Sequence, residues 1–367
     1  MSSQLFSPYR LRGLEMPNRV VVSPMAQYSA TAAGHATAWH LMHYGNVALS
    51  GAGLVIFEAT AVEAAGRVSA RCLGLWNDAQ AESLRPVLGF CREHGAAKLG
   101  VQLAHSGRKG SVQRPWEGQN SIGPDEEGWQ VVSSCAEAYP GRPVPHALSL
   151  AEMAALTESY VAATRRADAI GFDLIELHAA HGYLLNCFLT PLANRRNDAY
   201  GGDLAGRMRY PLEVFAAIRA AWPAHKPLGV RISATDWKEG GWTGEDSVAF
   251  AKALKALGCD YIGASSGGVA ADQKIVLGPG YQVPYAAQVQ REAGIPAMAV
   301  GMISEAEQAE AIVRNGQAEM VALGRGMTWN PRWAWHAADA LGAKAPFPPQ
   351  YARSHSSMRF GDPAKPR

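Results

Sequence analysis

Short apolar runs alternate with longer amphipathic segments from about residue 19 to the C-terminal part of the chain. The apolar runs are typical of buried strands, and the segments between them have the spacing of helices that bury one face. The predicted strands are 19–25, 53–58, 98–103, 172–177, 228–233, 261–264, 297–300 and 320–323. The predicted helices are 36–49, 79–94, one that begins after Ser149, 207–221, 243–257, 283–292, 304–314 and 331–341.

Repeated strand–helix units predict a parallel sheet, because each helix carries the chain back to the edge where the next strand starts. Eight such units predict a closed (β/α)8 barrel, a TIM barrel, as one domain over residues 1–367 with an N-terminal cap. An open, doubly wound sheet is the alternative, which we disfavour because no G-x-G-x-x-G follows the first strand. The pattern breaks at 105–148, where we expect a long lid insertion after the third strand, and a tail is expected over 343–367.

Composition and charge restrict the possible classes of function. The chain has 367 residues, of which 48% are hydrophobic and 18% charged, and its formal net charge is +2. This balance favours neither nucleic acid nor a membrane as partner, and no apolar run is long enough to span a bilayer. The five cysteines form no C-x-x-C pair, which argues against a disulfide framework, a zinc site and an iron–sulfur cluster. The N-terminus has no apolar core, so we expect no signal peptide and a cytoplasmic protein.

Residues at the ends of the strands carry the first chemical signal, because in such a barrel they face the active site. The last two predicted strands end at Gly301 and at Gly324-Arg325. Glycine lets backbone N–H groups approach an anion and arginine adds a charge-assisted bond, so these residues indicate a phosphate site. The alternative is that the glycines only allow turns in the loops after these strands.

Two polar residues lie inside apolar strands. Arg231 stands in the strand 228–233, where a buried guanidinium is costly unless an anion or another acceptor meets it. A structural ion pair is the alternative explanation. Gln102 lies in the strand 98–103 and offers both a donor and an acceptor, which suits the edge of an amide-like ring.

The most informative segment is H-A-A-H-G-Y-L-L at 178–185, directly after a predicted strand. Two imidazoles can hold a substrate oxygen and a phenol can deliver a proton, so His178, His181 and Tyr183 indicate polarisation of an acceptor followed by protonation. Taken singly, the histidines could be core residues or metal ligands, and the tyrosine could be packing. We expect no metal, because no cysteine or carboxylate completes a ligand set and Glu176 should point in a different direction.

Further motifs along nearly the whole chain give this segment its context. They are S-P-M at 23–25, Q-Y-S at 27–29, E-A-T-A-V at 58–62, G-R at 66–67, Q-L-A-H at 102–105, G-R-K at 107–109 and N-R-R-N-D-A-Y-G-G at 194–202. In this combination the sequence resembles the Old Yellow Enzyme family of flavin-dependent ene-reductases. It is most similar to the short bacterial branch of NADPH dehydrogenases called thermophilic-like or xenobiotic-reductase-like.

The resemblance implies a flavin mononucleotide (FMN) that is bound without a covalent bond. The residues that would line its isoalloxazine ring are Ser23, Pro24, Met25, Ala26 and Ala59. Gln102 would meet the pyrimidine edge, and Arg231 would lie near N1 and O2, where a fixed cation favours the anionic reduced form. Gly301, Gly324 and Arg325 would hold the phosphate, in agreement with the argument from the strand ends.

The resemblance also implies a ping-pong reaction. NADPH or NADH would pass hydride to flavin N5 and leave, and an activated alkene such as an enone, enal, maleimide or nitro compound would take its place. His178 and His181 would bind the acceptor oxygen, Tyr183 would protonate the α-carbon, and Tyr28 would contact the substrate. The alternatives are a flavin- or ligand-binding barrel without turnover and a flavin reductase with a different acceptor.

Some residues depart from that branch or extend it. Ala26 stands where the branch usually has cysteine, and the loss of a weak donor beside the flavin predicts a lower reduction potential. The tail resembles one that reaches into a neighbouring subunit, which implies a homodimer or homotetramer in which Arg353 completes the neighbour's pocket. In the insertion, Trp116 and Trp129 could line the substrate pocket, but we expect both to pack on the barrel.

Overall fold

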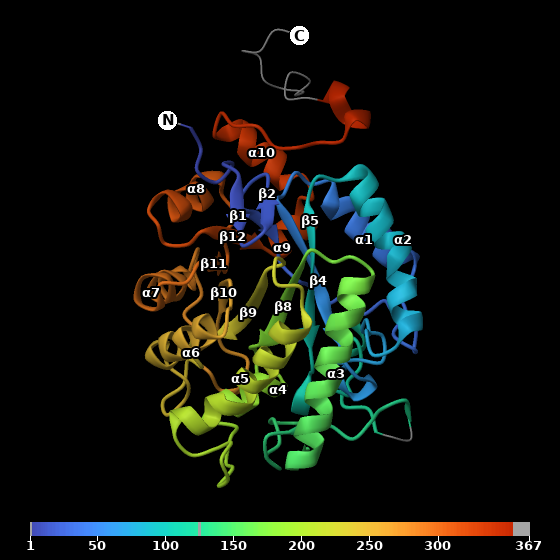
Figure 1. Ribbon diagram of the computed structural model, residues 1–367, viewed down its shortest axis with the longest axis vertical. Coiled ribbons are helices and arrows are strands. Elements are labelled where there is room, and N and C mark those ends of the chain that lie inside the picture. The colour runs from blue at the N-terminus through green and yellow to red at the C-terminus, as the bar shows by residue number, and fades with distance from the viewer. Residues whose placement is uncertain (1, 124–125, 355–367) are drawn as a thin grey trace.

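The computed structural model describes residues 2–123 and 126–354. Its centre is a closed barrel of eight parallel strands in chain order, in which the last strand pairs with the first (Figure 1). The barrel strands are β3 (Val20–Val22), β4 (Leu54–Ala61), β5 (Lys98–Ala104), β8 (Leu174–Ala179), β9 (Leu228–Ser233), β10 (Tyr261–Ser265), β11 (Ala297–Val300) and β12 (Met320–Leu323). The predicted (β/α)8 barrel is therefore confirmed.

Helices surround the barrel (Figure 1). They are α1 (Ala38–Ala48), α2 (Asp78–His94), α3 (Leu150–Ala169), α4 (Leu184–Leu189), α5 (Leu204–Ala221), α6 (Gly244–Ala256), α7 (Val283–Ala293), α8 (Ala306–Arg314), α9 (Arg325–Trp329) and α10 (Trp333–Ala340). The sequence did not predict α4 or α9, which are short. All six residues of α4 are buried, so no polar face is present to reveal its helical period.

Side chains at the helix starts explain where two helices begin. Ser149 Oγ accepts the N–H of Glu152 while the Glu152 carboxylate accepts the N–H of Ser149, which forms the predicted capping box of α3. Asp203 accepts the N–H of Gly206 and caps α5. Helix α5 therefore begins at Leu204, earlier than the predicted start at 207.

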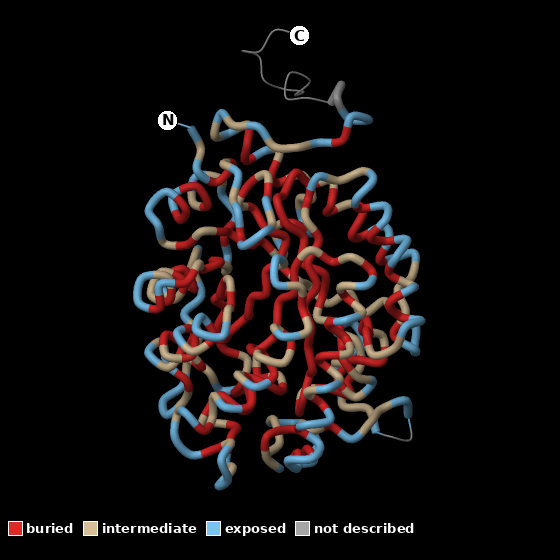
Figure 2. The backbone as a smooth tube through the Cα atoms, in the orientation of Figure 1, coloured by how far each residue is buried: buried red, intermediate tan, exposed pale blue. Residues whose placement is uncertain are grey.

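Two apolar cores lie on the two sides of the barrel wall. Nearly all residues of the barrel strands are buried (Figure 2). The inner core is closed by an antiparallel hairpin of β1 (Tyr9–Leu11) and β2 (Leu14–Met16), which is the N-terminal cap that the sequence predicts. Leu11 and Met16 of this hairpin pack with Leu174 of β8. Ile175 and Leu177 belong to the outer core beneath the helices, as the alternation of side chains along a strand requires.

A β-bulge in β4 sets the direction of one predicted flavin-site residue. The pairing of β4 with β5 shifts between Phe57 and Ala59, so Glu58 is an extra residue. Phe57 stacks on Tyr44 of α1, and Glu58 hydrogen-bonds to the same tyrosine through its N–H and its carboxylate. Ala59 instead pairs with Gln102, whose side chain lies inside the barrel. The bulge thus lets two successive residues face α1 and returns Ala59 to the interior.

The segment 105–148, predicted as a lid insertion, contains little regular structure. Its described elements are the 3-10 turns η2 (Gly107–Lys109) and η3 (Pro115–Glu117) and the short parallel pair β6 (Val132–Ser133) and β7 (His146–Ala147). One more 3-10 turn, η1 (Ala64–Gly66), follows β4, and another, η5 (Pro349–Ser354), ends the described chain. Within 2–123 and 126–354, none of the helices is both long enough and apolar enough to cross a membrane.

Candidate active site

Polar side chains converge inside the barrel at the C-terminal ends of β8, β9 and β10. His178 on β8 is in register with Arg231 on β9, and Ser233 at the end of β9 is in register with Ser265 at the end of β10. Paired residues of neighbouring parallel strands face the same side of the sheet, so these four side chains share the interior. All four are buried, and His178 is only 4% exposed.

Gln102 and Glu176, which are in register on β5 and β8, lie one step further into the barrel. Gln102 Nε2 donates to Glu176 Oε1 at 2.7 Å, and Tyr261 Oη donates to Glu176 Oε2 at 3.0 Å. Burial raises the pKa of Glu176, and the positive charge of Arg231 opposes this rise. The prediction that Glu176 points in a different direction from His178 is wrong, because residues two apart on a strand share a face.

Arg231 has few partners for a buried guanidinium. Its Nη1 donates to Ser23 Oγ at 3.4 Å, and its Nε is buried with no hydrogen-bond partner among the described residues. An unmet buried donor is costly, and an acceptor edge such as N1 and O2 of a flavin would satisfy it. The residues at the centre of the barrel therefore fit FMN.

His178 and His181 form a close pair. Nε2 of His178 lies 3.3 Å from Nδ1 of His181, and the ring planes are 80° apart. Burial, together with the nearby positive charges of Arg231 and Lys109, lowers the pKa of His178 to about 3. Burial and the neighbouring His178 also hold the pKa of His181 well below its usual value. Both rings are therefore neutral near pH 7, so each carries one N–H and one acceptor nitrogen.

The backbone turns sharply after β8. His181 and Gly182 both have left-handed backbone conformations, with φ of 62° and 72°. A Cβ on Gly182 would lie 2.4 Å from the carbonyl oxygen of Gly268, so only glycine fits there. This turn brings the ring of His181 back towards His178 and places Tyr183 at the start of α4.

Three side chains hold His181 in this unusual conformation. Ser233 Oγ accepts its N–H at 2.8 Å, and Lys109 Nζ donates to its carbonyl oxygen at 2.8 Å. Ser265 Oγ lies 2.7 Å from its Nε2. The sequence argument assigned no role to Ser233 or Lys109. Ser233 could have been found from its position two residues after Arg231, whereas Lys109 comes from the insertion, whose path has no periodic signal.

Tyr183 lies beside the histidines. Its ring centroid is 5.0 Å from that of His178, and Lys109 Nζ is 5.4 Å from the centroid of the phenol ring. Burial raises the pKa of Tyr183 well above its usual value, and the nearby Tyr28 raises it further. Burial also raises the pKa of Tyr28 to about 12. Both phenols keep their protons at neutral pH.

The two tryptophans of the insertion behave differently. Trp116 is 63% exposed and its ring meets that of Tyr28 edge to face, with centroids 6.1 Å apart. The expectation that it packs on the barrel is wrong. Trp129 is half-buried beneath the guanidinium of Arg67, whose carbon lies 4.8 Å from the ring centroid, as expected of a packing residue. Trp116 therefore extends the aromatic surface of Tyr28.

The remaining predicted cofactor residues follow β3, β11 and β12. Met25, with Pro24 and Ala26 on either side, lies close to Gly324, since a Cβ on that glycine would be 3.5 Å from the Met25 sulfur. Gly301 has a φ of 118°. Arg325 is exposed at the start of α9. The side chain of Arg353 lies outside the described residues.

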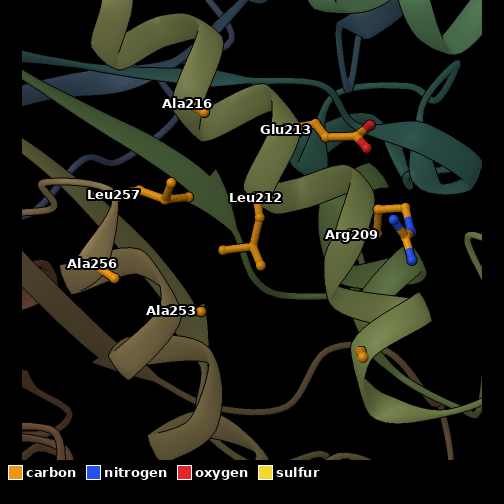
Figure 3. A pocket seen from close by; sticks show the side chains of 8 residues that line it. Arg209, Leu212, Glu213, Ala216, Ala253, Ala256 and Leu257 are labelled. Carbon is orange, nitrogen blue, oxygen red and sulfur yellow. The ribbon is translucent and has the colours of Figure 1, made fainter.

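Two cavities lie elsewhere on the molecule. One of about 520 Å³ lies between α5 and α6 (Figure 3). It is lined by Ala205, Arg209, Leu212, Glu213, Ala216, Ala253, Ala256 and Leu257. Another, of about 230 Å³, lies where residues 346–349 pack against the ends of α1 and α2. Neither contains a predicted site residue, so the candidate chemistry belongs to the mouth of the barrel. Within the described residues, no three His, Cys, Asp or Glu side chains are grouped to hold a metal ion.

Comparisons with known proteins agree with this geometry. Residues 4–343 match the NADH:flavin oxidoreductase / NADH oxidase family. The chain is 43% identical over 354 residues to an NADPH dehydrogenase of Geobacillus thermodenitrificans, a match that covers 96% of this chain and 99% of the relative. It is 42% identical over 353 residues to an NADPH dehydrogenase of Listeria monocytogenes, and the covered shares are again 96% and 99%.

Solved structures show the same fold. Morphinone reductase aligns with a TM-score of 0.78 at 26% identity, over 100% of this chain and 96% of that chain. An Old Yellow Enzyme homologue from Zymomonas mobilis aligns with a TM-score of 0.75 at 25% identity, over 94% of each chain. Together with the match over nearly the whole sequence, this shows that the chain belongs to the NADH:flavin oxidoreductase / NADH oxidase family, that of Old Yellow Enzyme, whose members are FMN-dependent oxidoreductases with a nicotinamide donor.

Proposed function

We propose that this enzyme reduces activated C=C bonds, such as those of enones, enals, maleimides and nitro compounds, with NADPH or NADH as donor. The observation that carries the proposal is the convergence of His178 Nε2 and His181 Nδ1 beside the ring of Tyr183. Two neutral imidazoles whose nitrogens lie side by side suit the binding of a carbonyl or nitro oxygen, and a protonated phenol next to them suits delivery of a proton.

FMN, when bound, supplies the hydride chemistry of both half-reactions. The residues that we propose to hold it are Ser23, Pro24, Met25, Ala26, Ala59, Gln102, Arg231, Gly301, Gly324 and Arg325. Arg231 carries the strongest argument, because its buried Nε lacks a partner and its fixed charge would stabilise negative charge at the polar edge of the ring. Gln102 lies one step further into the barrel, on β5, and donates to Glu176.

The histidine pair would bind and polarise the substrate. As hydride reaches the β-carbon, negative charge develops on the acceptor oxygen, and imidazole donors held beside the bound oxygen stabilise that charge without movement of their rings. Because burial keeps both imidazoles neutral, each would contribute one hydrogen bond rather than a charge. Their effect is therefore expected to change little with pH near neutrality.

Tyr183 would donate the proton that completes the reduction at the α-carbon. Its raised pKa keeps the phenol protonated, so a proton is available at every turnover. Tyr28, with Trp116 beside it, would contact the substrate at the rim of the pocket. We also propose that residues 1–367 act as one domain, in which the insertion 105–148 provides this rim.

The alternatives explain fewer of these features. A flavin reductase with a different acceptor would need neither a paired oxygen site nor a buried protonated tyrosine, and a ligand-binding barrel would need no proton donor. Support for a nicotinamide donor comes from the solved complex of morphinone reductase with tetrahydroNAD, a protein that is 26% identical to this chain.

The fate of labelled hydrogen tests the proposal. We expect NADPH deuterated at C4 to reduce 2-cyclohexenone to cyclohexanone with deuterium on the β-carbon and a solvent proton on the α-carbon. Mass spectrometry and NMR of the product locate the two atoms. Oxidation of NADPH with no saturated ketone would contradict alkene reduction and favour a flavin reductase with another acceptor.

We further propose that the enzyme is a homodimer or homotetramer in which Arg353 reaches a neighbouring subunit. Residues 346–349 pack at the N-terminal end of the barrel, opposite the histidines, so this tail is poorly placed to serve its own site (Figure 1). The side chains of Trp39 and Met42 on α1 and Trp329 on α9 are exposed, which suits a covered surface. Sedimentation gives the assembly state, and an Arg353→Ala variant that stays oligomeric with an unchanged KM would contradict the role.

A further inference from the structure

The hydrogen bonds around His178 determine which of its nitrogens carries the proton. The backbone N–H of Ala180 donates to His178 Nδ1 at 3.2 Å. A backbone N–H can only donate, so Nδ1 is the acceptor and the single proton of the neutral ring is on Nε2. Nε2 of His178 is therefore a donor, and it points at Nδ1 of His181 at 3.3 Å.

It follows that the free site holds His181 in the tautomer that cannot bind substrate. Nδ1 of His181 accepts from His178, so its own proton is on Nε2 and is donated to Ser265 Oγ at 2.7 Å. The Ser265 hydroxyl in turn donates to Gln282 Oε1 at 3.4 Å. In this arrangement His181 offers a lone pair, not an N–H, to the space between the two rings.

An acceptor oxygen between the rings needs an N–H from each of them. His178 already supplies Nε2–H, but His181 must carry its proton on Nδ1, which leaves a lone pair on Nε2. A hydroxyl group can both accept and donate, so Ser265 can reverse its hydrogen bond with Nε2. We propose that Ser265 is a positioning residue that selects the tautomer of His181, and that substrate binding reverses the Ser265–His181 hydrogen bond. The inference rests on the proposed function, because it assumes an acceptor oxygen at this site.

The surroundings of Ser265 allow this reversal at a small cost in free energy, because few hydrogen bonds are lost. Its hydroxyl gives up only the long contact to Gln282, and Gln282 Oε1 keeps a hydrogen bond from Ser266 Oγ at 2.6 Å. Gln282 is also held by its Nε2, which donates to the carbonyl oxygen of Val300 at 3.1 Å. The ring of His181 carries one proton in both states, so the change releases and takes up none.

The backbone of His181 is fixed independently of Ser265. Its N–H is held by Ser233 and its carbonyl oxygen by Lys109, each at 2.8 Å. The ring therefore stays between His178 and Ser265 while only the position of its proton changes. Ser265 itself is at the end of a barrel strand and is 5% exposed, so little solvent competes for the Nε2 hydrogen bond.

Neighbouring serines provide a matched pair of variants for the test. Ser266 also hydrogen-bonds to Gln282 but has no hydrogen bond to His181 among the described residues. For oxidised, FMN-loaded enzyme without reductant, we expect Ser265→Ala to tighten the binding of 2-cyclohexenone by about 5- to 10-fold, because the free site would then hold the buried Nε2–H of His181 without an acceptor, whereas the bound site would leave only a lone pair without a donor. Ser266→Ala should bind as the native enzyme does, and Ser265→Thr, which keeps the hydroxyl, should restore an affinity close to the native one.

Nitrogen-15 NMR of histidine-labelled holoenzyme reports the tautomer directly, with the His181 signals assigned from a His181→Asn variant. We expect the proton of His181 on Nε2 without ligand and on Nδ1 with 2-cyclohexenone. The inference is overturned if the tautomer does not change on binding, or if Ser265→Ala and Ser266→Ala bind the enone equally. If native enzyme reduces the enone in either of these cases, the proposed function stands, whereas failure of native enzyme to bind any enone overturns both.

Discussion

Replacing Tyr183 with phenylalanine removes one oxygen from the site and leaves the rest of the ring in place. The ring packs 5.0 Å from His178 and lies 5.4 Å from Lys109 Nζ, and neither contact depends on the hydroxyl group. The histidine pair and the cofactor residues belong to other elements, so substrate binding should persist. The change therefore isolates the proton that we propose Tyr183 to deliver.

The expected loss follows from the role of a general acid. Proton delivery by a positioned side chain contributes about 10²- to 10⁴-fold, which corresponds to about 2.7–5.4 kcal/mol of barrier height. Burial raises the pKa of Tyr183, so the hydroxyl is protonated throughout the neutral range and the loss should not vary with pH there. In the proposed reaction the step affected would be the transfer to the alkene, whereas reduction by NADPH would need no such proton.

Anaerobic stopped-flow absorbance separates the two half-reactions. We expect Tyr183→Phe to be reduced by NADPH at a nearly native rate, to be reoxidised slowly by 2-cyclohexenone and to be reoxidised normally by ferricyanide, which takes electrons without carbon protonation. Tyr139→Phe is a matched control, because Tyr139 also lies near Lys109 Nζ, at 5.0 Å, but not against His178. Native rates of enone reduction in Tyr183→Phe would refute the assignment, and equal losses in both variants would show a general effect of removing a hydroxyl near Lys109.

Three further outcomes are expected. Ala26→Cys should raise the midpoint potential of the bound flavin, because the thiol adds a weak donor beside the ring. Equal potentials in the native enzyme and the variant would contradict this prediction. Binding of 2-cyclohexenone to the oxidised enzyme should be constant from about pH 5 to 7, because burial lowers the pKa of His178 to about 3 and the ring stays neutral above that value. A loss of affinity as the pH falls through 6.5 would contradict this expectation. Gly182→Ala should lower the free energy of unfolding by clearly more than Gly316→Ala, by about 1–3 kcal/mol, because both glycines have positive φ but only Gly182 would place a Cβ against backbone. Urea unfolding measures the difference, and similar losses in both variants would count against the tight turn.

Much of the fold could be predicted because the signal is local. The apolar runs of β8 and β9 and the cap at Ser149 are set by neighbouring residues, so sequence reasoning can find them. The short helix α4 could not be found in this way, because it is buried on all sides and has no polar face. The bulge at Glu58 depends on pairing with β5, which the sequence of β4 alone does not encode.

In the candidate site, too, residues with a local sequence signal were predicted and residues placed by long-range contacts were not. Arg231 and His178 were predicted to face the interior from their places in and after apolar strands, and the structure places both there. Lys109 was missed because its contacts to His181 depend on the path of an insertion with no periodic pattern. Trp116 was misjudged for the same reason, since its contact with Tyr28 joins segments whose relative positions only the folded chain defines.

The central claim is that bound FMN carries hydride from a nicotinamide to an activated alkene in two separate steps. The most direct measurement is the visible spectrum of the purified enzyme, followed without oxygen as NADPH and then 2-cyclohexenone are added. We expect a flavin spectrum that bleaches with NADPH and returns in full with the enone. A flavin that bleaches but does not return would contradict alkene reduction, and absence of a flavin spectrum even after FMN is added would contradict the cofactor site itself.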